Sequence, residues 1–265
     1  MTELDQSQPT SIDHIGSPTG EAALPQYRMS SIVGIWAAAA LPMAALSWVA
    51  APLLSGALPG ASPLVSALLL CLTVGLVWQC VLVLVLVRRE QGRLSWPVLQ
   101  EALWLRAPRS PSSGRMGGRV WFVLVPLIVV FAAEQFVPGL PIPAGRDFAV
   151  FLESDAGQSF FDGSWGWFAV VVAMGLFNTV LGEELLFRGF LLPRMQGAFG
   201  GADWLANGVL FALYHLHTPW VIPSTLIDSV VLALPAKRYR SAWIPIVVHS
   251  TQTVFISLAV LAVVR

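Results

Sequence analysis

Long apolar runs separated by short polar stretches dominate the chain from residue 31 onwards. A membrane-spanning helix needs about 20 mostly apolar residues, and seven segments approach or reach that length. They are residues 31–54, 64–87, 120–137, 165–192, 204–217, 220–236 and 243–264. The pattern predicts an all-α, polytopic membrane protein with about seven transmembrane helices.

The pair of segments 204–217 and 220–236 is less regular than the others. The first is short, and the second contains Pro223, Pro235 and Asp228. Irregular backbone at membrane depth is tolerated where it lines a polar cavity. Two alternatives therefore stay open: two short spans, or one broken or re-entrant unit that lines a cavity.

The charges between the runs predict an orientation and divide the chain into four parts. Residues 1–30 are polar, lack a signal-peptide pattern, and are predicted to form a disordered cytosolic tail. Residues 31–137 hold the first helices, and their loop 88–119 carries seven arginines and two glutamates, which predicts a cytoplasmic location. The acidic loop 138–164 is expected outside, and residues 165–264 form the second transmembrane region. We expect an integral protein of the plasma membrane with a cytoplasmic N-terminus.

Composition agrees with a membrane protein and argues against nucleic-acid binding. The chain is 56% hydrophobic and 11% charged, with a mean hydropathy of +0.71, whereas soluble domains are about 25% charged. No basic face is present outside the apolar runs, so no nucleic-acid partner is expected. Cys71 and Cys80 fall in one predicted helix and cannot pair with each other there.

Three charged residues interrupt the apolar run 165–192: Glu183, Glu184 and Arg188. Each charge costs about 2.5 to 3.5 kcal/mol at the centre of an inserted helix, so such residues pair, bind a ligand or do chemistry. Glu184 and Arg188 are four apart and are predicted to form an ion pair on one helix face. Glu183 points about 100° away and is left free for chemistry. Gly182 and Gly189 flank the cluster and are expected to allow close helix approach.

Histidines in two other apolar segments are expected at compatible depths. His215 shares a helix face with Phe211, and His249 shares one with Thr253. A partly desolvated glutamate can take a proton from water, and histidines can hold the water, stabilise an oxyanion or bind a metal. We predict that Glu183, His215 and His249 are catalytic and that the reaction is hydrolysis within the membrane.

Three further predictions concern the residues around that group. Two histidines and one glutamate match a zinc-hydrolase ligand set in kind, so zinc held by Glu183, His215 and His249 stays open. His217, beside Pro219, is expected at the membrane interface. Asp228 is either a helix cap or a cavity-facing group.

Three short motifs resemble those of the CPBP (or ABI) family, which contains the type II CAAX prenyl endopeptidases. The first, Glu-Glu-x-x-x-Arg, is Glu183 to Arg188 followed by Gly189. The second, Phe-x-x-x-His, is Phe211 to His215. The third is His249 to Thr253, where the endopeptidases tend to have asparagine at the last position. The resemblance covers roughly residues 165 to 257.

The resemblance implies a membrane-embedded peptidase, either a metalloprotease or a glutamate protease. Glu183 and His215 would activate water and His249 would form the oxyanion site, with Glu184, Arg188 and Thr253 in support. The expected partners are the lipid bilayer and a peptide or lipid-modified peptide substrate. Two other classes stay open: a non-catalytic immunity or scaffold protein, and a small transporter, which the lack of internal repeats disfavours.

Overall fold

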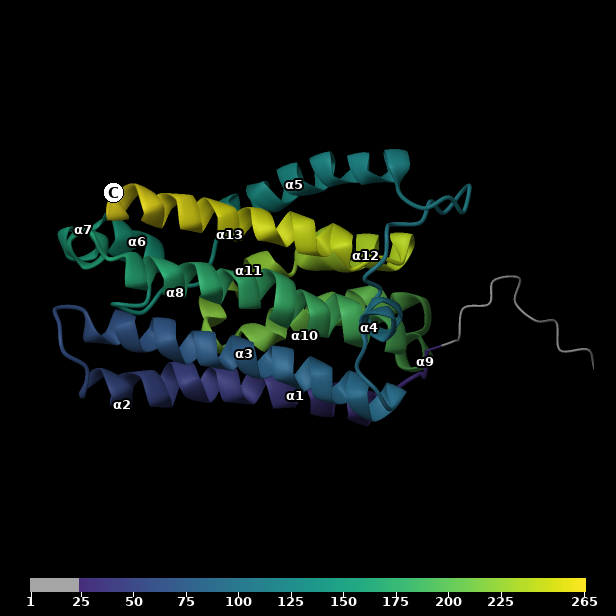
Figure 1. Ribbon diagram of the computed structural model, residues 1–265, viewed down its shortest axis with the longest axis horizontal. Coiled ribbons are helices and arrows are strands. Elements are labelled where there is room, and N and C mark those ends of the chain that lie inside the picture. The colour runs from purple at the N-terminus through teal and green to yellow at the C-terminus, as the bar shows by residue number, and fades with distance from the viewer. Residues whose placement is uncertain (1–23) are drawn as a thin grey trace, which may run out of the picture.

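Long apolar helices run side by side along the long axis of the molecule (Figure 1). The computed structural model describes residues 24–265, so most of the predicted tail lies outside the described residues. Within that range the chain is helical and contains no strand beyond an isolated bridge between Arg109 and Met116. The predicted all-α class is confirmed.

The first half of the described chain contains two long helical rods, a surface helix and a shorter inclined helix. Its elements are α1 (Met29–Ala45), the π-helix η1 (Leu46–Ala50), α2 (Ala51–Ser55), α3 (Pro63–Gln91), α4 (Trp96–Ala102), η2 (Gly118–Val123), α5 (Leu124–Ala133) and η3 (Glu134–Phe136).

The second half begins with two short helices and then forms the bundle that carries the three motifs. Its elements are α6 (Phe148–Glu153), α7 (Asp155–Phe161), α8 (Trp165–Leu176), η4 (Phe177–Gly182), η5 (Leu185–Leu191), η6 (Leu192–Arg194), α9 (Gln196–Phe199), η7 (Gly200–Ala202), α10 (Asp203–Tyr214), η8 (His215–His217), η9 (Pro219–Val221), α11 (Ile222–Thr225), η10 (Ser229–Ala233), α12 (Leu234–Tyr239) and α13 (Trp243–Val264).

Four helical rods in the described range are long and apolar enough to cross a membrane: Met29–Ser55, Pro63–Gln91, Trp165–Arg194 and Trp243–Val264. They correspond to the predicted spans 31–54, 64–87, 165–192 and 243–264. The prediction of about seven spans is not confirmed. The helix Gly118–Ala133 is shorter than a span, α10 has 12 residues, and Pro219–Thr225 is bent by 52° from Ser229–Tyr239. Counting that bent pair as one span gives at most five.

The segment from α10 to α12, which includes the bent pair, forms a hairpin that starts and ends at the same end of the bundle (Figure 1). Lys237, near the end of α12, forms an ion pair with Asp203, the first residue of α10. The prolines in the second limb remove backbone donors and interrupt regular helix geometry. Of the two alternatives, the structure favours the broken or re-entrant unit.

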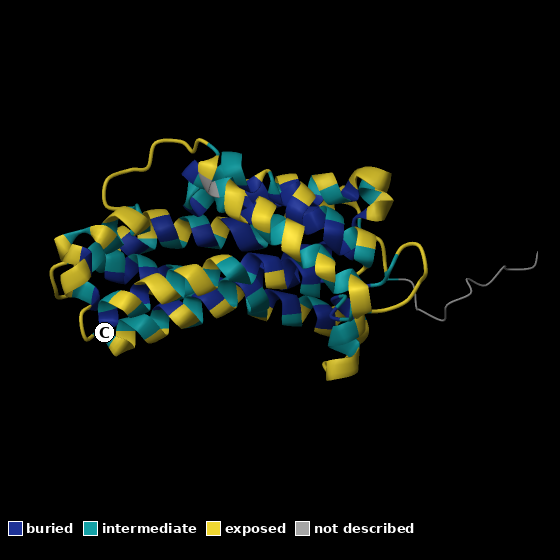
Figure 2. Ribbon diagram, turned by 90° about the horizontal axis from the view of Figure 1, so that it is seen from above, coloured by how far each residue is buried: buried dark blue, intermediate teal, exposed yellow. Residues whose placement is uncertain are grey.

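Basic and acidic loops separate to opposite ends of the bundle. The start of α1, the end of α3, and α4, α9 and α12 lie at one end, whereas α6, α7 and the C-terminus lie at the other (Figure 1). The predicted basic loop 88–119 thus shares an end with Lys237, and the acidic loop 138–164 lies away from it. The outer helix faces expose large apolar side chains, among them Leu53, Phe122 and Phe255, as lipid contact requires (Figure 2).

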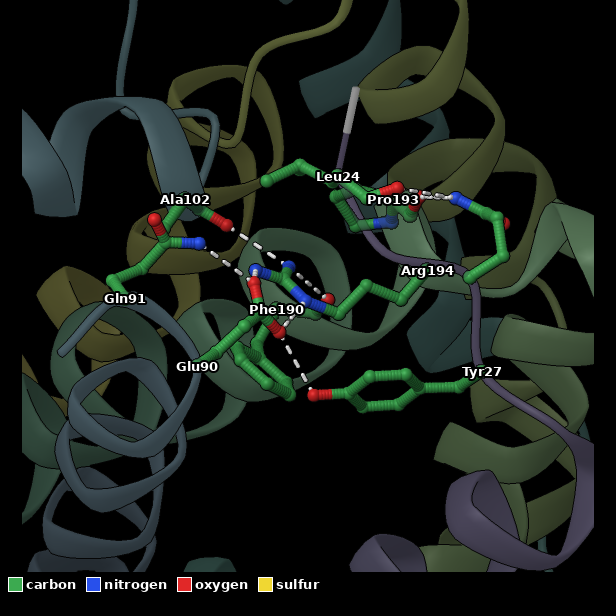
Figure 3. Close-up of polar contacts among 9 residues, drawn as sticks. Leu24, Tyr27, Glu90, Gln91, Ala102, Phe190, Pro193 and Arg194 are labelled. Atoms are coloured by element: carbon green, nitrogen blue, oxygen red, sulfur yellow. Dashed lines mark hydrogen bonds and ion pairs between the residues drawn. The ribbon is translucent and has the colours of Figure 1, made fainter. Parts of the chain in front are cut away.

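The helix Trp165–Arg194 carries the first motif and is called the motif helix below. An ion-pair cluster connects the end of this helix to other segments at the end of the bundle that holds the basic loop 88–119 (Figure 3). Arg194 is fully buried and donates from Nε and Nη2 to the two carboxylate oxygens of Glu90, at 2.8 and 2.6 Å. Its Nη1 donates to the carbonyl oxygens of Ala102 and Phe190. Tyr27 donates its hydroxyl to Glu90 at 2.8 Å. The cluster therefore joins four segments at one point: the segment before α1, α3, α4 and η5–η6.

Candidate active site

The helix Trp165–Arg194 widens where its charged residues lie. Regular α-helix ends at Leu176, and π-helical turns cover Phe177–Gly182 and Leu185–Leu191. A π-turn stacks residues five apart, and such turns are frequent at functional sites. Here it places Asn178 beside Glu183. With the amide group of Asn178 assigned so that its nitrogen faces the carboxylate, that nitrogen donates to Oε1 at 2.8 Å and to Oε2 at 3.2 Å.

Glu183 is buried and held by neutral donors. It is 2% exposed, and besides Asn178 it is hydrogen-bonded to the Tyr214 side chain. The Tyr214 hydroxyl in turn accepts a hydrogen bond from Nε2 of Gln79. These contacts orient the carboxylate while leaving it without a lysine or arginine partner in the described residues.

Glu184 and Arg188 form the predicted ion pair. Arg188 Nη1 lies 3.1 Å from Glu184 Oε1, and both side chains are fully buried. The same oxygen accepts a second hydrogen bond, from Nδ1 of His249 at 2.8 Å. Glu184 therefore links α13 to the motif helix. Helix spacing predicted the ion pair with Arg188 but not this contact with His249.

His215 lies just beyond the last turn of α10, and its ring is fixed by one backbone contact. Nδ1 lies 3.0 Å from the carbonyl oxygen of Phe211. A carbonyl oxygen can only accept, so Nδ1 carries the proton in this contact and Nε2 is the remaining ring nitrogen. His249 is fixed in the same way through Nδ1, by Glu184.

The Phe211 ring lies between the charged residues of all three motifs. The guanidinium carbon of Arg188 lies over it, 3.9 Å from its centroid. The rings of His215 and His249 meet it edge-on, with centroid distances of 4.9 and 6.1 Å. This apolar ring thus sets the positions of three polar side chains.

One cavity of about 240 Å³ receives the three side chains predicted to be catalytic. Glu183 comes from the motif helix, His215 from the end of α10 and His249 from α13. The lining residues are Phe131, Glu134, Asn178, Glu183, Phe211, His215, His217, Thr218, Val221, Ser224, Thr225, Asp228, His249 and Gln252. Most are polar, so the cavity can hold water and a peptide group within the bundle.

Two residues of the broken hairpin line the cavity, one of them against expectation and the other as one of its two alternatives allowed. His217 was expected at the membrane interface, but it is 7% exposed, lines the cavity and stacks on His215 with a centroid distance of 5.4 Å. The hairpin turns inward after His215, which carries His217 into the bundle. Asp228 lines the same cavity and is 2% exposed.

Thr253 is not brought together with the three catalytic candidates. It packs against Gly175, and its hydroxyl lies 3.4 Å from the Thr179 hydroxyl. It lines a neighbouring cavity of about 170 Å³, whose wall is mostly apolar and includes Met43, Leu76 and Ile256. The supporting role predicted for Thr253 stays a prediction.

The zinc alternative requires the predicted ligands to gather around one point. Within the described residues, no group of three or more histidine, cysteine, aspartate or glutamate side chains has an arrangement that could hold a metal ion. Nδ1 of His249 is engaged by Glu184 and Nδ1 of His215 by a carbonyl, which leaves Nε2 of each ring as the nitrogen that could bind a metal, but the rings and the Glu183 carboxylate do not gather around one point. These residues as placed do not fit a zinc site.

Sequence reasoning missed Asn178 and Tyr214 as neighbours of Glu183, and Gln79 as the partner of Tyr214. Each is a polar side chain inside an apolar run, which was the available signal. Their proximity depends on the π-turn and on packing between α3, α10 and the motif helix. The spacing of residues along one regular helix therefore could not predict these contacts.

Comparison with known proteins supports the motif assignment. A family model described as type II CAAX prenyl endopeptidase Rce1-like matches residues 164–255, the part of the chain that holds all three motifs and the lining of the cavity from Asn178 to Gln252. Searches of curated proteins and of solved structures gave no match. The matched family is a family of membrane peptidases. With its apolar helical rods the chain is an integral membrane protein, and its residues 164–255 are similar to the Rce1-like family of type II CAAX prenyl endopeptidases.

Proposed function

We propose that this protein is an intramembrane endopeptidase that hydrolyses a peptide bond with water activated by Glu183 and His215. One observation carries the proposal: Glu183, His215 and His249, from three separate helices, line a single polar cavity. Such convergence of buried ionisable groups in a cavity is the usual mark of a catalytic site.

In the proposed first step, the Glu183 carboxylate takes a proton from a water molecule while His215 Nε2 orients that water. The resulting hydroxide attacks the carbonyl carbon of the substrate and forms a tetrahedral intermediate. A doubly protonated His249 would keep its contact with Glu184 through Nδ1 and offer Nε2–H to the oxyanion. The proton held by Glu183 then passes to the leaving nitrogen as the C–N bond breaks, giving a carboxylic acid and an amine and returning Glu183 to its carboxylate form; the acid then gives its proton to the amine, so that the products are a carboxylate and an ammonium.

The proposed substrate is a peptide with an apolar or lipid-modified residue near the bond that is cut. The apolar cavity that contains Thr253 shares Asn178, His217, Thr218 and Gln252 with the polar cavity. An apolar group can therefore lie next to the catalytic residues while the peptide group lies between them.

The experiment that tests the proposal is cleavage of membrane-tethered peptides by the purified protein in proteoliposomes. Glu183→Gln should abolish cleavage, because glutamine cannot take the proton from water. Glu101→Gln, which changes an exposed acid on α4, is the matched control and should cleave like the parent. If Glu183→Gln retains full activity, the proposed base is wrong. If the parent protein binds peptides without cutting any of them, the non-catalytic immunity or scaffold alternative replaces it.

No step of this mechanism passes through a metal, because the described side chains do not form a ligand set. The zinc alternative has its own test, in which metal content and cleavage rate are measured before and after dialysis against a chelator. We expect cleavage to survive chelation. Loss of stoichiometric zinc together with activity, and recovery of both on adding zinc, would show that a ligand set forms in the working enzyme.

We further propose that the basic end of the bundle faces the cytoplasm, in the plasma membrane. The loop 88–119 carries seven arginines, and Lys237, Arg238 and Arg240 lie at the end of α12, as the positive-inside rule requires for a cytoplasmic end. The C-terminus lies at the opposite end (Figure 1). A C-terminal alkaline phosphatase fusion should therefore be active, and a C-terminal fusion of a cytoplasm-dependent fluorescent protein should be dark; the reverse pattern would invert the topology.

A further inference from the structure

Two carboxylates that the mechanism does not use lie in the catalytic cavity. Asp228 occupies the break between α11 and η10, and Glu134 is the first residue of η3, at the end of α5. Both line the cavity that receives Glu183. They are close enough for their charges to interact, although they are 94 residues apart in sequence.

Asp228 is almost completely buried and incompletely paired. It is 2% exposed, and its Oδ1 atom has no hydrogen-bond partner among the described residues. Leaving a buried acceptor unsatisfied is costly, and each such atom in a native protein asks for an explanation. Because Asp228 lines the cavity, a ligand in the cavity can supply the missing donor.

The described lining of the cavity contains three carboxylates and no lysine or arginine. The cations that interact with Asp228, Arg188 and a protonated His249, are both already paired with Glu184. Ser224 and Thr225 also line the cavity, and because their hydroxyls donate to backbone carbonyl oxygens, the hydroxyl oxygens can add further acceptors. The α11–η10 side of the cavity is therefore suited to a group that carries positive charge and several donors.

The spacing of these carboxylates favours an organic cation over a metal ion. A single metal needs its ligands within about 2 to 2.6 Å of one point, and the described side chains do not gather in that way. An ammonium or a guanidinium extends its donors over a larger space and can reach carboxylates that are further apart.

We propose that Asp228, assisted by Glu134, forms a cationic subsite that binds a lysine or arginine side chain of the peptide near the bond that is cut. The subsite deepens the proposed endopeptidase function and rests on it for its place in the reaction. It makes Asp228 a specificity-determining residue rather than part of the proton transfer.

Binding and cleavage are measured separately so that failure of the subsite and failure of the endopeptidase function can be told apart. The probes are hydrophobic peptides with an N-methylated, uncleavable test bond. They carry either arginine or its neutral isostere citrulline at one of the positions flanking that bond. Binding to the protein in nanodiscs gives a ratio of dissociation constants for each pair, and the corresponding unmethylated peptides give cleavage rates.

At one flanking position, the parent protein should bind the arginine peptide about tenfold to a hundredfold more tightly, as expected for a buried hydrogen bond between charged groups. Asp228→Asn, which keeps the shape of the side chain, should reduce that ratio to near one. Glu134→Gln should reduce it in part. Glu153→Gln, which alters an exposed acid on α6, should leave the ratio unchanged.

Each outcome decides one of the two claims. Equal binding of the arginine and citrulline peptides by the parent protein, or an arginine preference that survives in both Asp228→Asn and Glu134→Gln, would overturn the subsite. No binding of either peptide would overturn it as well. An Asp228-dependent preference without any cleavage of the unmethylated peptides would support the subsite and refute the endopeptidase function. Because Glu134→Gln changes a less buried residue, it keeps the test valid if Asp228→Asn fails to fold.

Discussion

The guanidinium carbon of Arg188 lies 3.9 Å from the centroid of the Phe211 ring, and both side chains are buried. Arg188 is held by Glu184 through Nη1 alone, and its Nε and Nη2 atoms have no hydrogen-bond partner in the described chain. The ring therefore supplies the contact that hydrogen bonds do not, worth about 2 kcal/mol or more when desolvated. The first two motifs are joined by this cation–π contact.

Replacing the ring should therefore affect stability and activity together. Phe211→Leu keeps an apolar side chain but removes the surface on which Arg188, His215 and His249 rest. We expect a loss of about 2 to 3 kcal/mol in the free energy of unfolding and a fall in peptide cleavage. Thermal unfolding in detergent and a cleavage assay measure the two effects. Phe122→Leu is the control, because that ring is 73% exposed; equal effects of the two changes would contradict the role of Phe211.

Glu184 has two partners, so its two roles can be separated. Glu184→Gln leaves Arg188 buried without a counter-charge and should cost about 3 to 5 kcal/mol of stability. Adding Arg188→Met removes the stranded charge and should restore part of that stability. The double variant still lacks the carboxylate that holds His249 Nδ1, so its cleavage rate should stay low. Recovery of activity in parallel with the unfolding temperature would show that Glu184 acts only as a structural clamp.

Spacing along one helix was enough to predict the Glu184–Arg188 pair, because residues four apart share a face in regular and in mildly distorted helices. The contact of Asn178 with Glu183 could not be predicted in this way, because residues five apart meet only across a π-turn. The burial of Arg194 could not be predicted from spacing either. It is buried because Glu90, more than one hundred residues earlier, meets it at the end of α3.

The predicted number of membrane spans was not confirmed, for a related reason. Hydropathy along the sequence cannot distinguish a short apolar helix that crosses a membrane from one that enters the bundle and bends at prolines. The segments 204–217 and 220–236 are apolar because they pack inside the protein, around a polar cavity. Their irregularity was visible in the sequence, whereas the inward position of His217 depended on the turn between them.

Close helix packing beside Glu183, the proposed base, makes Gly182 sensitive to substitution. A Cβ atom at this position would meet the carbonyl oxygen of Phe177 and lie 3.3 Å from that of Leu76 on α3. Gly182→Ala should therefore destabilise the protein by about 1 to 3 kcal/mol and shift the neighbouring Glu183. Gly166→Ala on α8 is the matched control, because nothing lies within 4 Å of the added atom there. Thermal unfolding compares the two, and an equal or smaller effect at Gly182 would contradict the close approach.

The ion-pair cluster of Arg194, Glu90 and Tyr27 at the basic end predicts a change in stability at high pH. Burial, followed by the hydrogen bond to Glu90 and the charge of that carboxylate, raises the pKa of Tyr27 from 10.0 to about 12. Between these values the unfolded chain loses the phenolic proton and the folded protein keeps it. The stabilising contribution of Tyr27 is therefore complete below about pH 10 and is lost as the pH rises towards about 12. Unfolding temperatures of the parent and of Tyr27→Phe, measured in detergent across this range, should converge as the pH rises. Tyr239→Phe, which removes a phenol from the same end of the bundle, controls for general effects of alkali, and a constant difference between the parent and Tyr27→Phe would refute the linkage.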